Sequence, residues 1–300
     1  MTHNKSGVTH PQGIIPAMVT PFHPDESLNE DALRHLTRHL IEGGAHGLFP
    51  TGSQGEFYAL TPEERAKVWA IVLNETAERV PVYAGTGAPT TRSVIQMNEM
   101  AERVGVDAVS VITPYFISPT DDELYRHYVA IADATALPVI LYSNPGRTGG
   151  LQLSTDLVTK LSSHENIVGI KDSSGDLTQT MAYIEATEKD FAVLLGRDTL
   201  IYAGLIHGAK GAITATANVD PALVVEIYEA FAAGDLDRAL DAQQRLAPLR
   251  RAFGLGTFPV VVKEALTMIG IPAGPARAPV GSLAPDQRTE LEQVIASLRQ

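Results

Sequence analysis

The reactive side chains of this sequence lie at the ends of apolar runs or in the turns that follow them. Lys171 follows the β-branched run at 166–170 and precedes a turn rich in serine and glycine at 173–175. A lysine amine held in a dry pocket loses its proton more easily and becomes a nucleophile toward a carbonyl carbon. The alternative interpretation is a strand-end lysine whose amine reaches water, because lysine is seldom fully buried.

Four further residues fit the same chemistry. Tyr142 ends another apolar run, and a phenol beside the lysine can pass the protons that imine chemistry requires. The backbone N–H groups of the turn around Ser53 and Gln54 can hold one carboxylate, and Arg147 can hold a second. Taken singly, these residues are typical of packing, turn formation or a surface charge. Together with Lys171 they indicate attack on the ketone of a 2-oxo acid, followed by making or breaking a carbon–carbon bond beside the imine.

The elements that must position these groups alternate between strands and helices. Short apolar runs predict eight strands, at 14–20, 47–50, 80–84, 108–112, 139–142, 166–171, 192–195 and 211–214. Amphipathic segments between them predict helices, including one at 30–42. Eight such units in about 230 residues are typical of an α/β protein with a closed (β/α)₈ TIM barrel. In that fold the carboxyl ends of the strands form one rim, which brings Lys171, Tyr142, Ser53 and Arg147 together.

An open, doubly wound sheet is the alternative architecture, but its phosphate-binding loop is missing. The segment 85–89 lacks the third glycine of a dinucleotide loop and carries a proline where a helix should begin. The sequence therefore predicts a flexible lead at 1–12, a catalytic barrel at 13–234 and a C-terminal helical region at 235–300. Three helices are expected in that last region, at 235–251, 258–269 and 285–298, serving packing or subunit contact rather than chemistry.

Composition excludes several classes of function. The net charge of −12 at pH 7 argues against a nucleic-acid partner or a polybasic membrane surface. The chain has no cysteine, and no apolar run reaches the ~18–20 residues of a membrane span. His35 and His39 have a spacing that can bind a metal, but they lie among arginines on the polar side of their helix, so no metal site is expected. No cofactor is expected either, and the polar N-terminus lacks a secretory signal, which indicates a cytoplasmic protein.

Seven segments, in this order, resemble the dihydrodipicolinate synthase / N-acetylneuraminate lyase family of pyruvate-dependent class I aldolases. The resemblance covers the chain from Gly13 onward, and the segment 142–149 reads Tyr-Ser-Asn-Pro-Gly-Arg-Thr-Gly. The matching segments are 13–22, 52–56 with 60–64, 84–87, 113–115, 142–149, 169–171 and 216–219.

This resemblance implies a role for each matching position. It implies a TIM barrel with a helical C-terminal region, Schiff-base formation at Lys171 and a phenol role for Tyr142. It further implies a proton relay through the Ser53 hydroxyl, with the pyruvate carboxylate held at Ser53 and Gln54 and contacts from Ile213. Members are commonly homotetramers built as dimers of dimers, so a homotetramer is expected.

The second substrate is less clearly indicated. Arg147 resembles the synthase branch, in which this arginine holds the carboxylate of aspartate semialdehyde. Two departures favour an aldolase or dehydratase acting on a 2-keto-3-deoxy sugar acid or on N-acetylneuraminate. Phe116 stands where synthases have a second tyrosine that completes a relay across the subunit interface, and Gln54 replaces the usual threonine. A non-catalytic 2-oxo acid sensor is the third possibility, and the presence of both Lys171 and Tyr142 argues against it.

Overall fold

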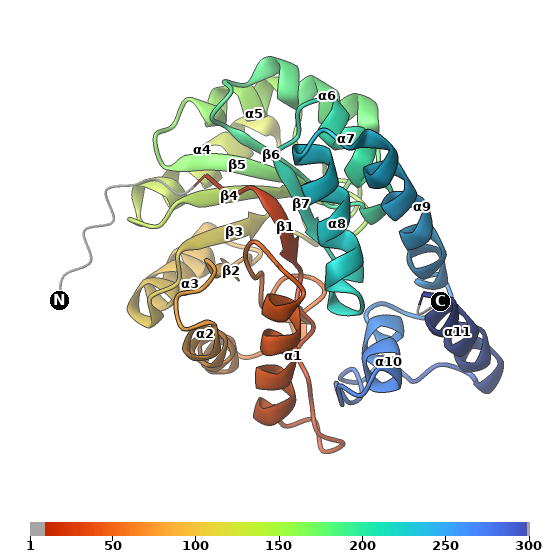
Figure 1. The fold of residues 1–300 in the computed structure, drawn as a ribbon. Coiled ribbons are helices and arrows are strands. Elements are labelled where there is room, and N and C mark those ends of the chain that lie inside the picture. Colours follow the sequence, from red (N-terminus) through yellow and green to blue (C-terminus); the bar gives the residue numbers. More distant parts are fainter. Residues whose placement is uncertain (1–9, 299–300) are drawn as a thin grey trace.

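The computed structural model describes residues 10–298, so most of the predicted flexible lead at 1–12 lies outside the described residues. Seven parallel strands form one curled sheet in the order β1-β7-β6-β5-β4-β3-β2. Figure 1 shows the strands at the centre of the molecule with helices outside them. The strands are β1 (Gly13–Pro16), β2 (Tyr83–Gly85), β3 (Ala108–Ile112), β4 (Val139–Ser143), β5 (Ile167–Asp172), β6 (Ala192–Leu195) and β7 (Gly211–Thr214).

The segment 46–50 occupies the eighth position and joins the two edges of the sheet. Phe49 N–H donates to the Pro16 carbonyl at 2.9 Å, and Tyr83 N–H donates to the Leu48 carbonyl at 2.8 Å. Its pairing with each edge is a single parallel bridge rather than a regular strand. Pro50 has no N–H to continue the ladder, and Thr51 has a φ of 53° in the left-handed region. The predicted barrel is thus confirmed, with an eighth strand shorter than the others.

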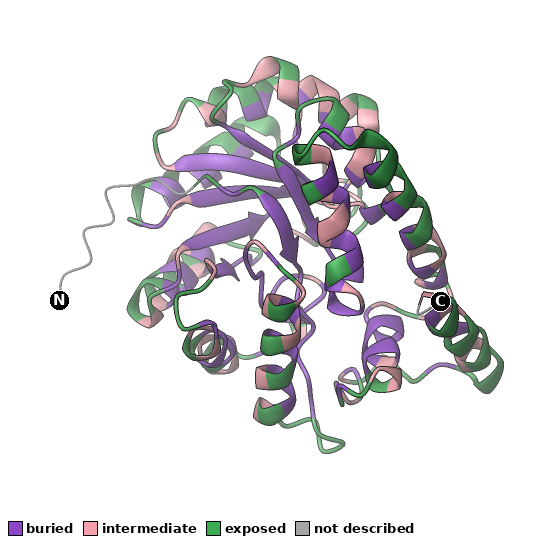
Figure 2. Cartoon of the chain, viewed as in Figure 1, coloured by how far each residue is buried: buried purple, intermediate pink, exposed green. Residues whose placement is uncertain are grey.

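A layer of side chains fills the interior of the barrel. Each of the seven strands and the segment 46–50 contributes to this layer. Both faces of the sheet are covered, which explains why the strands read as continuous apolar runs. Figure 2 shows buried strands and helices whose outer faces are exposed. The inner layer consists of Ile15, Ala17, Phe49, Tyr83, Ala108, Ile140, Val168, Leu194 and Ile213.

Seven helices of the described chain connect the strand positions and an eighth follows β7, and most of these helices start with a capping side chain. The Thr61 and Thr120 hydroxyls cap the helices that begin at Pro62 and Asp121, in capping boxes with Glu64 and Glu123. The helices are α1 (Glu30–Glu42), α2 (Pro62–Thr76), α3 (Thr91–Val104), α4 (Asp121–Asp133), α5 (Thr155–Ser162), α6 (Leu177–Ala186), α7 (Ile201–Ile206) and α8 (Pro221–Ala232). Short 3₁₀ turns lie at η1 (Phe57–Ala59), η2 (Asp198–Leu200) and η3 (Thr216–Asn218).

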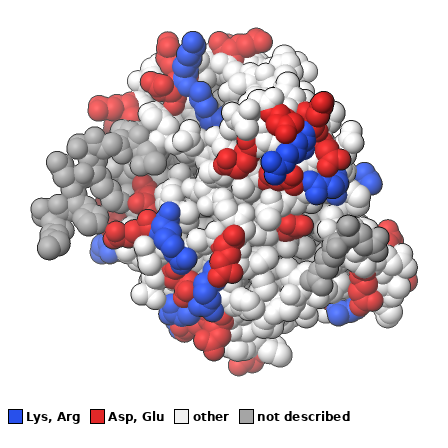
Figure 3. Space-filling model, viewed as in Figure 1, with Lys and Arg blue, Asp and Glu red and all other residues white. Residues whose placement is uncertain are grey.

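Three further helices follow the barrel: α9 (Leu236–Ala252), α10 (Val260–Met268) and α11 (Pro285–Leu298). Helix α9 packs along α8, and α10 packs against α11. None of the helices within residues 10–298 is long and apolar enough to cross a membrane. On the face shown in Figure 3, acidic and basic side chains are interspersed, so that face presents no broad basic patch.

Candidate active site

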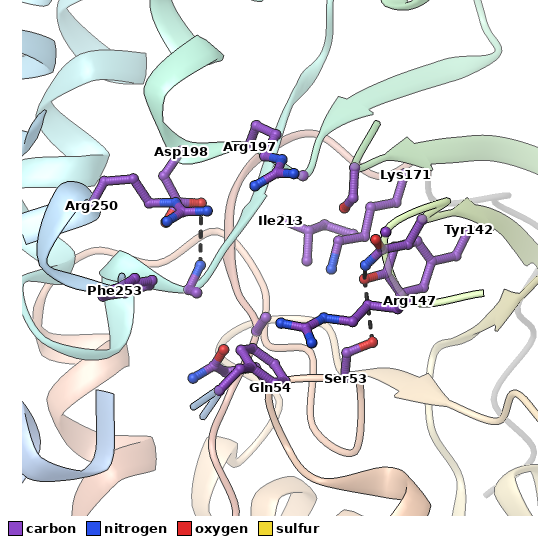
Figure 4. A pocket seen from close by; sticks show the side chains of 17 residues that line it. Ser53, Gln54, Tyr142, Arg147, Lys171, Arg197, Asp198, Ile213, Arg250 and Phe253 are labelled. Carbon is purple, nitrogen blue, oxygen red and sulfur yellow. Dashed lines mark hydrogen bonds between the residues drawn. The ribbon is translucent and has the colours of Figure 1, made fainter. Parts of the chain in front are cut away.

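A cavity of about 400 Å³ opens at the carboxyl ends of the strands. The six residues predicted for catalysis and substrate binding lie on its wall, although they come from four separate parts of the chain (Figure 4). They are Ser53, Gln54, Tyr142, Arg147, Lys171 and Ile213.

Lys171 lies near the end of β5 directly beside Tyr142 of β4, because the two residues are register partners in the sheet. Its side chain is only 4% exposed, so the amine does not reach bulk water as the alternative interpretation required. The Lys171 Nζ atom lies 4.3 Å from the centroid of the Tyr142 ring and 4.9 Å from that of Phe49. Within residues 10–298 this amine has no carboxylate partner, which leaves it available to a ligand in the cavity.

The Tyr142 hydroxyl is the centre of a short polar network. It accepts a hydrogen bond from Asn144 Nδ2 at 2.8 Å and lies 3.4 Å from Ser53 Oγ. Burial by itself raises the pKa of this phenol, but a positive charge on Lys171 acts in the opposite direction. Hydrogen bonds from Ser53, Asn144 and Ser173 add to that effect, and the pKa of Tyr142 falls below its ordinary value of 10. A phenol in this setting can exchange protons with groups on both sides.

The turn at 51–56 is held in place by contacts outside the cavity. The indole N–H of Trp69 donates to Thr51 Oγ1 at 2.6 Å. At the end of β2, a Cβ added to Gly85 would come within 2.2 Å of the Thr51 carbonyl oxygen, so only glycine allows this approach. The Gln54 side chain is buried, and its amide atoms have no hydrogen-bond partner in the described chain. A buried amide without partners is costly, which indicates a polar ligand at this point of the wall.

Glu56 closes the same turn and faces away from the chemistry. It is fully buried, and its carboxylate pairs with Lys263 of α10 at 2.5 Å and accepts the Arg277 backbone N–H at 3.0 Å. These contacts give Glu56 a structural role, in which it ties the turn to α10 and to the segment around Arg277.

Sequence reasoning missed one wall of the cavity. Arg250 and Phe253, at the end of α9, line it together with Phe258, so the helical region 235–300, which was expected to serve packing or subunit contact, also contributes to the cavity wall. Phe258 stacks on Arg147, whose guanidinium carbon lies 4.5 Å from the ring centroid. Arg197, in the turn after β6, was also missed. Only the packing of α9 against the barrel brings these residues to the rim, and no local motif indicates it.

No cluster within residues 10–298 combines three histidine or carboxylate side chains that could hold a metal ion. The polar side chains on the cavity wall include an amine, a phenol, hydroxyls, amides, guanidinium groups and the Asp198 carboxylate.

Comparison with known proteins identifies the family. The sequence profile of the dihydrodipicolinate synthetase family matches residues 10–298. The chain belongs to this family. Members of the dihydrodipicolinate synthetase family are pyruvate-dependent lyases that work through a Schiff base, and the predicted family and fold are confirmed.

Three relatives illustrate the similarity. The 4-hydroxy-tetrahydrodipicolinate synthase of Methanoculleus marisnigri is 40% identical over 95% of this chain and 99% of its own length. The dihydrodipicolinate synthase DapA-2 from Bacillus anthracis superposes with a TM-score of 0.92, at 37% identity over 95% of this chain and 98% of that one. YagE of Escherichia coli K12, solved in complex with pyruvate, has a TM-score of 0.92 and 33% identity over 96% and 98% of the two chains.

Proposed function

We propose that this protein condenses pyruvate with aspartate semialdehyde, as a 4-hydroxy-tetrahydrodipicolinate synthase does. The observation that carries the proposal is a buried amine, Lys171, beside a hydrogen-bonded phenol, Tyr142, in a cavity that Arg147 also lines. Full-length relatives with that name at about 40% identity support it.

In the proposed reaction the unprotonated Lys171 amine attacks the ketone carbon of pyruvate, and water leaves as the imine forms. The imine nitrogen withdraws electrons, so the methyl group loses a proton and becomes the nucleophilic carbon of an enamine. That carbon adds to the aldehyde, whose oxygen takes a proton. The amino group that came from aspartate semialdehyde then displaces Lys171 from the imine carbon, which closes the ring and frees the lysine. Tyr142 and Ser53, 3.4 Å apart, pass the protons that these steps require.

Binding of the two substrates is assigned to different residues of the wall. The N–H groups and side chains of Ser53 and Gln54 hold the pyruvate carboxylate, with Ile213 in contact from β7. Arg147, stacked on Phe258, holds the carboxylate of the aldehyde. Stacking fixes the plane of the guanidinium, which suits a bidentate contact.

A second candidate is an aldolase or dehydratase for a 2-keto-3-deoxy sugar acid or N-acetylneuraminate, and one observation favours it. Phe116 has no hydroxyl with which to extend the relay.

The same residue also bears on the oligomeric state, because Phe116 is 101% exposed on a backbone with a φ of 74°. A fully exposed phenylalanine on strained backbone is costly unless another surface covers it. We therefore also propose a cytoplasmic homotetramer, built as a dimer of dimers, in which a second subunit covers Phe116 and its exposed neighbour Ile117.

Steady-state assays of the purified protein test the function directly. Pyruvate with aspartate semialdehyde is expected to give turnover, while N-acetylneuraminate and 2-keto-3-deoxy sugar acids are cleaved at least about 10-fold less efficiently. Cleavage of a sugar acid with no condensation of aspartate semialdehyde would replace the first candidate by the second. Sedimentation velocity measures the oligomer, and a monomer would contradict the tetramer.

A further inference from the structure

Three arginines line the cavity, which is two more than the proposed substrates require, because the turn at 51–56 binds pyruvate and Arg147 binds the aldehyde carboxylate. Arg147 follows β4, Arg197 follows β6 and Arg250 lies near the end of α9. Figure 4 shows their side chains pointing toward a common space, with Lys171 and Tyr142 on its other side. Arg147 points toward the turn that carries Ser53 and Gln54, whereas Arg197 and Arg250 lie away from that turn (Figure 4).

The guanidinium groups of these arginines have no ion pair or hydrogen bond within residues 10–298. Other arginines of the chain form ion pairs with carboxylates. Arg38 pairs with Glu75 at 2.9 Å, and Arg277 pairs with Glu64 at 2.5 Å. The chain has 35 acidic residues against 23 lysines and arginines, so carboxylates are plentiful. Arginines that line a cavity and have no carboxylate partner indicate that an anionic ligand binds there.

The one carboxylate on the cavity wall does not neutralise them. Asp198 is buried, and its oxygens accept the backbone N–H groups of Ala215 at 3.4 Å and Thr216 at 2.9 Å. Asp198 thereby fixes the loop after β7 and is occupied by that loop.

Arg197 and Arg250 are both held in position. A Cβ added to Gly175, in the turn after β5, would lie 3.1 Å from Arg197 Nε, so the arginine lies close against the turn that follows Lys171. The guanidinium of Arg250 lies 5.1 Å from the centroid of the Phe253 ring, which also lines the cavity. An arginine stacked on an aromatic ring loses less entropy when it binds an anion.

We propose that Arg197 and Arg250 hold an anionic group, a carboxylate or a phosphate, at the far end of the carbonyl substrate. This inference rests on the proposed function, because it assumes that an aldehyde meets a pyruvate enamine on Lys171. It extends that function to aldehydes longer than aspartate semialdehyde. The enamine carbon forms the new bond to the aldehyde carbon, the aldehyde oxygen takes a proton, and hydrolysis of the imine releases a 4-hydroxy-2-oxo acid and the amine.

Matched pairs of aldehydes, each offered with pyruvate, test this inference. One pair is glyceraldehyde 3-phosphate and glyceraldehyde, and the other is glutarate semialdehyde and pentanal, whose chains are one carbon longer than that of aspartate semialdehyde. In one of the two pairs, kcat/KM is expected to be at least about 10-fold higher for the charged aldehyde than for its uncharged counterpart. The pair that shows this preference identifies the bound group as a phosphate or a carboxylate. Arg197→Gln and Arg250→Gln each reduce this ratio about 10-fold. Arg251→Gln is the matched control, since Arg251 is an exposed neighbour on the same helix that does not line the cavity.

Equal ratios in the wild type and in the Arg197 and Arg250 variants would overturn the inference, and so would the absence of a charge preference in both pairs. A preference that survives both substitutions assigns the anion to Arg147. These results differ from a failure of the proposed function, in which the wild type neither condenses aspartate semialdehyde nor forms an imine with pyruvate.

Discussion

Two lysines are buried within residues 10–298, and their surroundings differ. Lys263 of α10 is 1% exposed, pairs with the Glu56 carboxylate at 2.5 Å and donates to the Pro275 carbonyl at 2.8 Å. Lys171 of β5 is 4% exposed and lies against aromatic rings with no carboxylate partner in the described chain. The first ties a C-terminal helix to the turn that carries Ser53, and the second faces an open cavity.

The comparison teaches that burial alone does not mark a reactive lysine. Burial lowers the pKa of the Lys263 amine to about 8, although the Glu56 carboxylate acts in the opposite direction. That amine is nevertheless enclosed and has its partners, so no substrate can reach it. Lys171 has the access and the neighbouring phenol that covalent catalysis needs.

The largest expected effect is the loss of turnover in Lys171→Met. Removing the nucleophile is expected to lower kcat by roughly 10⁴-fold or more. The free energy of unfolding should change by no more than about 1 kcal/mol, because no ion pair is broken. Lys160→Met, at an exposed position of α5, is the control for loss of a lysine. Activity within 10-fold of the wild type would remove Lys171 from the mechanism.

Tyr142→Phe separates binding from proton transfer. The variant is expected to lose about 10²- to 10⁴-fold in kcat while it still forms an imine with pyruvate, because the ring is kept and only the hydroxyl is lost. Tyr125→Phe, on the exposed side of α4, is the matched control. An unchanged kcat would show that the phenol takes no part.

Lys263→Met probes the other member of the comparison and should act on stability instead. Leaving the Glu56 carboxylate buried and unpaired is expected to cost about 3–5 kcal/mol, measured by chemical denaturation. Lys263→Met with Glu56→Gln should recover part of that loss. The folded variant should still form an imine at Lys171, and loss of the imine without loss of stability would contradict the structural role.

His127 on α4 gives the smallest expected effect and extends the comparison to a third buried base. Burial lowers the pKa of this imidazole to about 4 from its ordinary 6.5, and its Nδ1 lies 2.9 Å from Thr91 Oγ1. The His127 imidazole binds a proton more readily in the unfolded chain than in the folded protein. The contribution of the neutral imidazole to the free energy of unfolding is therefore complete above pH 6.5 and is lost as the pH falls toward 4. The loss amounts to about 3 kcal/mol.

Thermal unfolding between pH 4 and pH 7 measures how the contribution of His127 to stability depends on pH. His127→Gln should show a shallower decline of Tm on the acid side than the wild type does. His207→Gln, at an exposed histidine, should keep the full decline. Parallel curves of Tm against pH for the wild type and the His127 variant would contradict a role of this imidazole in the loss of stability at low pH.

Much of this molecule was predictable from its sequence because the relevant signals are local. Apolar runs that end on Lys171 or Tyr142 predict buried strands, and the capping residues set the helix starts within one or two positions. The residues near Lys171 could be brought together because all parallel strands of a barrel end at one rim. Arg250 and Phe253 could not be placed in this way, since their position depends on how α9 crosses the barrel.

The network around Tyr142 lay between these extremes. Ser53 was predicted beside Tyr142, but Asn144, which donates to the same hydroxyl at 2.8 Å, was not. Its side chain turns back from the loop after β4, and this orientation follows from the loop conformation rather than from the spacing of the residues.

The most direct test of the central claim is reduction of the protein with borohydride in the presence of pyruvate, followed by intact mass and peptide mapping. The expected result is a single irreversible addition of reduced pyruvate, located on Lys171 and absent without pyruvate or in Lys171→Met. Addition at Lys263, or no addition at all, would contradict the assignment of Lys171 as the lysine that forms the imine.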